Sequence, residues 1–494
     1  MSFLSLSNEL LANCFACLGY HKDDIQSLRL VCKRFHANAS PLLVRKAHIA
    51  FNRQSLEDLE ALSNHPAFSK GINHITIDLS YYDELLAKSR RKFAEHNACD
   101  LSQDLEWMDR SMYSRKNENG NIKEAHEEIN RALTEAYKAV DEWEKVLEDY
   151  DWLHCENSAT EAQKLLITAH EEYVRMFDEQ ETVLGSEQGV KRLVQALDRM
   201  PVLKKISLGD QEQLRSIRGR FSYLETLSSE GLKKRCLRRG SWKGSFTTAL
   251  ETKPPVHIVS DLFAALAESS VRPTAFNFKI SAPADMRCLN FSSAQLEAVS
   301  KVLDRAETLE IRVQSWARKG SLAENNDRPA EELAGLCALT RAFFSSPRLS
   351  HIEFGLHNYP CFYETPTISL SNLLPLPLSS VNISQIRFEA IPLKLSELKD
   401  IVESTKDTLQ DLGMFSPYLL DGKWADGLDI LRNLKILESI TFNGPHGGEY
   451  GDRGDGPEIE RTGREYILHI YDQNPLDGWT PEEEESAVSA ASED

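Results

Sequence analysis

Short segments in which apolar and polar side chains alternate recur along most of this chain, and helically spaced apolar residues precede several of them. Alternation predicts half-buried β-strands, and apolar residues three and four positions apart predict amphipathic helices. The predicted strands cover residues 75–79, 203–208, 276–280, 309–313, 349–354, 386–388, 412–414 and 440–442. Phe354, Phe388, Met414 and Phe442 hold equivalent places in their segments and are 34, 26 and 28 residues apart. We therefore expect stacked strand–helix units with their strands in one parallel sheet.

The spacing of these units is near the period of leucine-rich repeats, which is about 20–29 residues. The chain has no clean L-x-x-L-x-L-x-x-N/C consensus. We therefore predict an α/β fold that resembles a degenerate leucine-rich-repeat-like solenoid, with its parallel sheet on the concave side. Residues 51–83 would form a first unit, and residues 186–444 would form the main solenoid. The alternative is a set of unrelated strand–helix elements in a compact fold.

Residues 84–185 interrupt the repeat with a purely helical pattern. Apolar positions recur at gaps of four and three over residues 129–150 and 162–183, which is the spacing of a coiled-coil seam. The link between them is short, so we expect an antiparallel helical hairpin, with a further helix around residues 101–112 against it. Residues 121–185 hold 17 acidic and 6 basic side chains, a net charge of −11. This acidity indicates either a solvated surface or an arm for docking or dimerisation.

Residues 215–243 have the opposite charge bias and are predicted to be a long loop or irregular insertion. A cluster of cations here is suited to gripping a phosphate or an acidic recognition segment of a target protein, or to serving as a nuclear localisation signal. The alternative is a solvated basic loop that neutralises the acidic arm. The candidate contacts to an anionic target are Arg218, Arg220, Lys233, Lys234, Arg235, Arg238 and Arg239.

Residues 4–43 predict three short helices. Ser7 is placed to cap the first, with Glu9 in its first turn at the positive end of the helix dipole. Asp23 and Asp24 begin the second, and a third ends near Pro41. Three short helices cannot bury much by themselves, so apolar surface should remain for a partner.

The segments LSNELLANCFACL at 6–18 and IQSLRLVCKRF at 25–35 resemble an F-box. The most specific part is VCKRF at 31–35, and Ser7 departs from the family by replacing its usual proline. The resemblance implies a domain over residues 1–50 that docks on the Skp1 adaptor of a cullin-RING ubiquitin ligase. Glu9 and Arg29 are candidate rim contacts. The candidates for core or adaptor surface, two roles that sequence does not separate, are Leu6, Leu10, Leu11, Phe15, Leu28, Leu30 and Val31.

The composition of the 494-residue chain narrows the function classes. Its formal charge of −19 argues against a general nucleic-acid or anionic-membrane binder. The sequence has no apolar run long enough for a membrane span and no signal-peptide pattern. Its nine scattered cysteines fit a reducing compartment. We expect a cytoplasmic or nuclear protein, or one found in both compartments.

Sequence motifs for catalysis or cofactor binding are missing. There is no G-x-x-x-x-G-K-[ST], G-x-G-x-x-G, H-E-x-x-H or G-x-S-x-G, so we expect no enzymatic activity of the chain itself, no cofactor and no metal. Cys14 and Cys17 have the spacing of a redox or metal pair, but no second pair accompanies them. We expect both in the core of the first helical domain.

Residues 445–494 form an acidic tail, predicted to be partly disordered, with a net charge of −11 and a predicted last strand at 466–471. Arm and tail together hold more negative charge than the whole chain, so the remainder is close to +3. A local anionic ligand at the basic segment is therefore compatible with the acidic composition.

Together these patterns predict a substrate-recognition subunit of an SCF-type ubiquitin ligase. It would bind Skp1 through the F-box and an unidentified target protein through the repeats. The alternative is a non-enzymatic scaffold in which the three helices only cap the solenoid and the acidic arm binds a partner.

Overall fold

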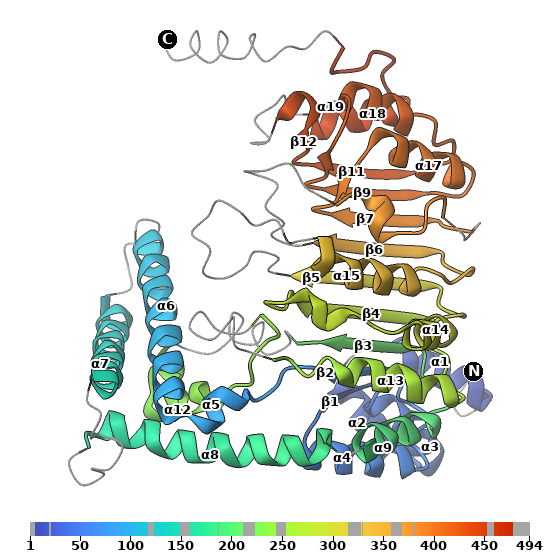
Figure 1. Cartoon of the computed structure of the whole chain (residues 1–494). Helices are drawn as coiled ribbons and strands as arrows, with labels where there is room; N and C mark the ends of the chain where they lie inside the picture. The colour runs from blue at the N-terminus through green and yellow to red at the C-terminus, as the bar shows by residue number, and fades with distance from the viewer. Residues whose placement is uncertain are drawn as a thin grey trace, which may run out of the picture.

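A computed structural model describes residues 5–18, 21–116, 123–148, 159–185, 187–210, 223–243, 253–314, 328, 330–356, 368–378, 380, 382–451 and 459–477. Within these residues, nine parallel strands form one large sheet whose spatial order follows the chain (Figure 1). The strands are β1 (Lys46–Ala50), β2 (His74–Asp78), β3 (Lys205–Gly209), β4 (Ala275–Ser281), β5 (Thr308–Gln314), β6 (His351–Leu356), β7 (Gln385–Glu389), β9 (Asp411–Phe415) and β11 (Ser439–Asn443).

The register of this sheet agrees with the repeat read from the sequence. Phe354 pairs with Phe388, Phe388 with Met414, and Met414 with Phe442 on the neighbouring strands. Because all neighbours are parallel, each connection must cross over and return to the same edge of the sheet. The predicted α/β fold with a large parallel sheet is therefore confirmed.

Helices cover the face of the sheet to which the apolar strand residues point, and one continuous core joins the two layers. The opposite face carries polar and charged side chains, many of them half-exposed, and we call it the polar face. The helices with side chains in this core include α4 (Arg53–Asn64), α9 (Glu187–Asp198), α13 (His257–Glu268), α14 (Ser293–Val302), α15 (Ala330–Phe343), α16 (Leu370–Leu373), α17 (Leu395–Thr405) and α18 (Trp424–Leu431). The 3-10 helix η5 (Met286–Leu289) adds to the same core.

Towards its C-terminal end, the described chain contains a second, small sheet and a last helix. The short strands β8 (Pro392–Leu393), β10 (Tyr418–Leu419) and β12 (His446–Gly447) form a second parallel sheet, followed by η6 (Gly448–Tyr450) and α19 (Glu460–Ile467). The predicted strand at 466–471 is wrong, because Gly463, Tyr466 and Ile467 are buried at helical spacing while Ile470 and Tyr471 are exposed. The predicted disorder at the end of the tail concerns residues outside the described ranges.

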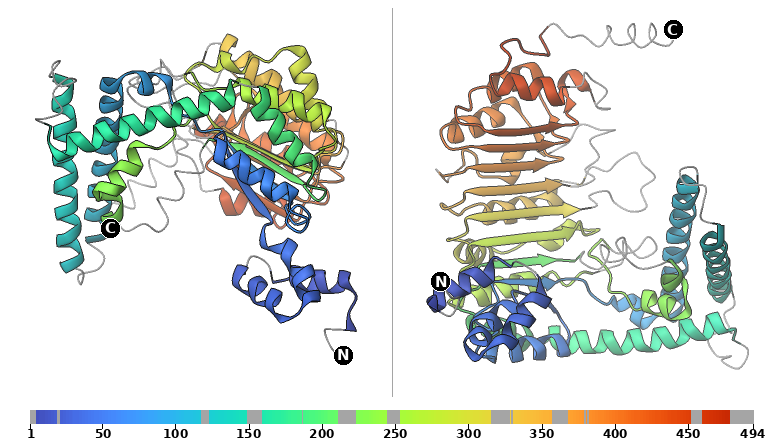
Figure 2. Two further views of the ribbon diagram at one scale, coloured as in Figure 1. Left: turned by 90° about the horizontal axis from the view of Figure 1, so that it is seen from below. Right: turned by 180° about the vertical axis from the view of Figure 1, so that it is seen from behind.

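The first residues form a separate three-helix module, which we define as residues 5–43. It consists of α1 (Asn8–Ala16), α2 (Lys22–Val31), α3 (Lys33–Ala39) and η2 (Ser40–Leu43). The module has its own small core and projects from the end of the sheet (Figure 2). Strand β1 lies inside the range 1–50 assigned to the helical domain from sequence, yet it pairs with β2 as part of the sheet.

A second helical body, the helical arm, stands at the side of the sheet (Figure 1). Its core combines residues from two chain segments, 84–185 and 223–237. Its helices are α5 (Glu84–Lys88), α6 (Arg90–Lys116), α7 (Lys123–Glu148), α8 (Glu161–Leu184), α11 (Tyr223–Leu227) and α12 (Ser229–Cys236).

The predicted hairpin of the two seam helices is wrong. Figures 1 and 2 show α7 beside α6, with α8 crossing near their ends. The seam on α8 instead serves two cores, since Leu166 and Tyr173 lie in the arm and Val183 lies in the core of the sheet. A heptad pattern identifies the apolar face of a helix but not the helix that covers it. Within the described residues, no helix is both long and apolar enough to cross a lipid bilayer.

Candidate functional site

The three-helix module divides its candidate residues between core and surface. Leu11 and Phe15 are buried, and the ring of Phe15 meets that of Phe35 edge-on, with centroids 5.1 Å apart. Leu6 and Leu28 pack against this core while remaining partly exposed. These four candidates therefore stabilise the module itself.

Three other apolar candidates point away from the core. Leu10 is 52% exposed, Val31 is 63% exposed and Leu30 is 87% exposed. Leu30 and Val31 end α2 directly before Cys32, whose Sγ accepts a hydrogen bond from the backbone N–H of Phe35 and caps α3. Covering exposed apolar side chains with an interface removes them from water and lowers the free energy. This surface is therefore suited to a protein partner.

The two candidate rim residues differ in their surroundings. Arg29 Nε donates to Ser40 Oγ at 2.9 Å, and its guanidinium lies 3.2 Å from His36 Nε2, so Arg29 ties α2 to the end of α3. Glu9 is exposed in the first turn of α1, and hydrogen bonds from its own backbone N–H and from Ser7 lower its pKa. Glu9 is thus a charged group beside the apolar surface.

The cysteine pair of α1 lies on the outside of the module. Cys14 and Cys17 are exposed, so the expectation that they belong to the core is wrong. The buried face of α1 is instead formed by Leu11 and Phe15, four positions apart. In the described ranges, no group of three or more His, Cys, Asp or Glu side chains is placed to hold a metal ion.

Within the predicted basic loop, residues 223–227 and 229–236 form the helices α11 and α12, whereas residues 237–243 are not helical. Ser228 caps α12 by accepting a hydrogen bond from the Gly231 N–H at 3.1 Å. The prediction of an irregular insertion is therefore wrong for these two helices, whose apolar residues Leu227, Leu232 and Cys236 pack into the arm. Arg218 and Arg220 lie outside the described residues.

Arg235, a candidate for binding anions, is used inside the arm. Its Nη2 lies 2.6 Å from Asp100 Oδ2 and donates to the Asp100 carbonyl at 2.8 Å, while Nη1 pairs with Asp104. Burial alone would lower the pKa of this guanidinium, but the two carboxylates outweigh burial and raise it. Lys233 Nζ also lies 3.0 Å from Glu172 Oε2. Part of the basic segment thus neutralises acids of the arm, as one of the two sequence interpretations proposed.

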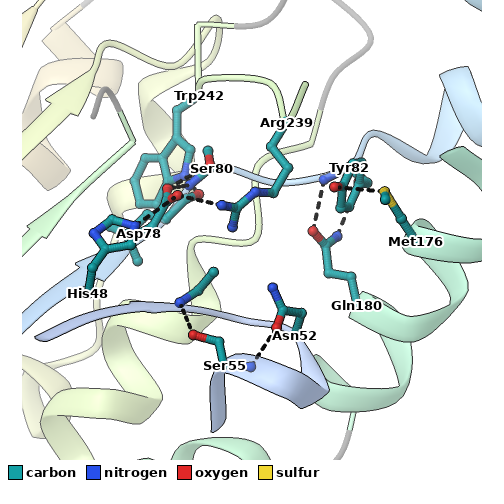
Figure 3. Close-up of polar contacts among 12 residues, drawn as sticks. His48, Asn52, Ser55, Asp78, Ser80, Tyr82, Met176, Gln180, Arg239 and Trp242 are labelled. Carbon is teal, nitrogen blue, oxygen red and sulfur yellow. Dashed lines mark hydrogen bonds and ion pairs between the residues drawn. The ribbon is translucent and has the colours of Figure 1, made fainter. Parts of the chain in front are cut away.

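Arg239 reaches the sheet instead. Its Nη2 lies 2.7 Å from Oδ2 of the buried Asp78, which His48 approaches at 3.7 Å (Figure 3). Arg238 is partly buried, and this burial together with the charge of Arg235 lowers its pKa. Only Lys234 of the described candidates is widely exposed, 3.4 Å from Glu230.

Trp242 completes the connection between the sheet and residues 237–243, which lead from the arm back to the sheet. Its backbone N–H donates to Asp210 Oδ2 at 2.7 Å, and its ring Nε1 donates to the Leu79 carbonyl at 3.0 Å. Asp210 also accepts a hydrogen bond from the Ser281 N–H at 2.9 Å. Full burial raises the pKa of Asp210 to about 6, although these hydrogen bonds to the carboxylate oppose the shift.

The polar face carries a charged ladder across four strands. Lys279 Nζ lies 2.5 Å from Glu310 Oε1, and Arg312 Nε lies 3.1 Å from the same oxygen. Arg312 also pairs with Glu353 and approaches Glu389 Oε2 at 3.6 Å. The central acids of this face are therefore paired with cations of neighbouring strands.

The sequence pattern predicted the positions of some of these residues but not their contacts with one another. Alternation in segment 75–79 places Asp78 on the polar side, yet its partner Arg239 is more than 150 residues away. The sequence around Asp210 and Trp242 did not indicate that these two residues are in contact, because their contact depends on how the arm returns to the sheet.

A scan against protein-family models found no match to this chain, and a search of curated proteins also found none.

Proposed function

We propose that this protein is the substrate-recognition subunit of an SCF-type ubiquitin ligase. In this proposal the three-helix module is an F-box that binds Skp1, and the stacked units are a leucine-rich-repeat-like solenoid that binds a target protein. The observation that carries the proposal is the exposure of Leu10, Leu30 and Val31 on a module with its own core. The F-box resemblance assigns these positions to the core or to the adaptor surface, and their exposure favours the second role.

Catalysis would belong to the assembled ligase rather than to this chain. A receptor that holds its target beside a ubiquitin-loaded enzyme raises the effective concentration of the two reactants. Such a role requires two separate binding surfaces held by rigid elements. The small core of the module and the large core of the sheet support such a division.

Co-purification of Skp1 with the full-length protein tests the proposal. The double variant Leu30→Asp, Val31→Asp places two charges on exposed positions, so we expect loss of Skp1 binding without loss of folding. Ile470→Asp is the matched control, because Ile470 is also an exposed apolar residue but lies at the other end of the chain. The proposal fails if wild type does not retain Skp1, or if the folded double variant binds Skp1 as wild type does.

The alternative of a scaffold whose acidic arm binds a partner is favoured by one observation. Asp141 and Glu144 are exposed on α7, beside the arm's buried Trp143. Replacing both acids with Lys should abolish capture of a basic partner under this alternative while leaving Skp1 binding unchanged. Deleting 84–185 would be a poor test, because Leu227 and Leu232 of the other arm segment would lose their packing partners.

A further inference from the structure

The polar face has a basic end on its first strands. Lys46 on β1, His74 on β2 and Lys205 on β3 are direct neighbours in the register of the sheet. We call these three residues the basic strip. Adjacent strands are about 4.8 Å apart, so the three side chains emerge within about 10 Å. Lys46 is exposed, and the other two are half-exposed.

Hydrogen-bonding groups lie beside this strip. His74 Nε2 is 2.9 Å from Ser207 Oγ and 3.4 Å from Thr76 Oγ1. Within the described residues, the Lys205 ammonium has neither an ion-pair nor a hydrogen-bond partner. Burial lowers the pKa of Lys205. The charge of Glu310 opposes this shift most strongly, Lys279 and Lys46 add repulsion, and Glu353 adds a smaller opposing charge.

The nearest acids of the polar face are held by other cations. Glu310, Glu353 and Glu389 are gathered around Arg312, and Asp78 is paired with Arg239. The face is thus closely balanced at β5–β7 and cationic at β1–β3. An arriving carboxylate would meet the Lys205 ammonium at a place where no anion of the described residues is in contact with it.

We propose that the basic strip binds an acidic, carboxylate-rich segment of the target protein, with the Lys205 ammonium as its central contact. The assignment of that segment to a target rests on the proposed function, whereas the binding of an acidic peptide does not. The strip follows the three-helix module by only a few residues, since η2 ends at Leu43 and β1 begins at Lys46. It replaces residues 223–239 as the anion-binding surface, because Arg235, Arg239 and Lys233 already have acidic partners.

The test is a fluorescence-anisotropy titration of the full-length protein with a labelled peptide of repeated Glu-Gly-Ser units. Lys205→Glu should weaken binding by about tenfold or more, because an attraction becomes a repulsion, and added sodium chloride should weaken wild-type binding. Lys205→Gln should give a smaller loss, and circular dichroism should show that both variants are folded.

Two matched charge reversals serve as controls. Lys234→Glu changes the exposed cation of the basic segment, and Lys301→Glu changes an exposed cation on helix α14. Both should bind the peptide as wild type does. Unchanged binding by folded Lys205→Glu overturns the proposal, and so does a loss confined to Lys234→Glu.

Two further measurements separate the remaining outcomes. If removing residues 478–494 tightens peptide binding about tenfold, the chain's own acidic tail occupies the strip and the assignment to a target segment is overturned. Skp1 co-purification with Lys205→Glu should match wild type. If Skp1 never binds while Lys205 still controls peptide binding, the ligase proposal fails and the acidic-peptide site stands.

Discussion

Asp78 and Arg239 form an ion pair 2.7 Å long that joins the second strand of the sheet to the segment returning from the helical arm. Asp78 is almost completely buried, and its other carboxylate oxygen accepts hydrogen bonds from the N–H and Oγ of Ser80 at 2.8 and 2.6 Å. Beside it, Tyr81 and Gly240 exchange backbone hydrogen bonds (Figure 3 shows the surrounding contacts). The arm is therefore fixed to the sheet by a charged contact and a backbone bridge.

Replacing Asp78 with Asn should destabilise the protein by about 2–4 kcal/mol, because Arg239 would remain largely buried without its counter-charge. Burial raises the pKa of Asp78, but the contact with His48 and the charge of Arg239 outweigh it and place the pKa below its usual value. Urea unfolding at neutral pH measures the loss. Asp472→Asn removes a fully exposed carboxylate that pairs with Arg432 and should cost less than about 1 kcal/mol. Equal effects of the two changes would contradict a structural role for the buried pair.

Replacing Arg235 with Met should loosen the arm by about 2 kcal/mol, because the ion pairs to Asp100 and Asp104 and a hydrogen bond to a backbone carbonyl are lost. The two half-exposed acids can regain water, which limits the cost. Hydrogen exchange should quicken in α6 and α12 more than in the sheet. Lys234→Met, at the neighbouring exposed position, should change exchange little, and an equal effect there would refute this reasoning.

The raised pKa of Asp210 predicts that the free energy of unfolding depends on pH. Its pKa of about 6 in the folded protein lies above the usual value of 3.8, so the folded state holds this proton more tightly than the unfolded state. Stability contributed by this group should therefore fall as pH rises from about 4 to about 6, by about 3 kcal/mol in total, and stay level above that range.

Asp210→Asn isolates this term, because other titrating groups are common to both proteins. Asn offers one acceptor oxygen to the two N–H groups of Trp242 and Ser281, so the variant should be less stable at pH 4.5. The deficit relative to wild type should shrink by pH 7. Urea unfolding at both pH values checks this, and a deficit that grows with pH would exclude the assigned shift.

The strands were predictable because alternation is a local signal, and Ile77, Phe354 and Phe442 occupy the expected buried positions. Strand β1 was missed, since its lysine and histidine flank only a short apolar run next to a helical domain. The helical partner of α7 was mispredicted because a seam at Leu133 and Val140 fits any apolar helix face.

The candidate site was less predictable from the sequence than the strands were. Sequence selected Leu11 and Leu30 together, because both are apolar residues on amphipathic helices, but only the three-dimensional packing separates the buried one from the exposed one. The role of Arg235 depended on Asp100 and Asp104, more than 130 residues earlier. Long-range ion pairs leave no periodic trace in a single sequence.

The junction between the module and the sheet depends on a glycine. A Cβ atom at Gly71 would lie 1.6 Å from the Pro41 carbonyl oxygen, a backbone atom that cannot turn away. Gly71→Ala should therefore separate η2 from the loop before β2 and cost about 1–3 kcal/mol. Limited proteolysis near residue 44 should become faster. At Gly240 an added Cβ would meet the Tyr81 carbonyl oxygen at an ordinary 3.7 Å, so Gly240→Ala should leave cleavage there unchanged.

The division of the module into core and surface predicts opposite consequences for two leucines. Leu11→Ala removes a fully buried side chain and should destabilise the three helices by about 2–4 kcal/mol, because it leaves a cavity beside Phe15. Leu30→Ala removes a side chain that is 87% exposed, so stability should change by less than about 0.5 kcal/mol. Hydrogen exchange of α1–α3 measures the first effect, and Skp1 affinity measures whether Leu30 serves a partner. Because folding is preserved, weaker Skp1 binding by Leu30→Ala would identify a contact, whereas faster exchange in that variant would show that Leu30 supports the module instead.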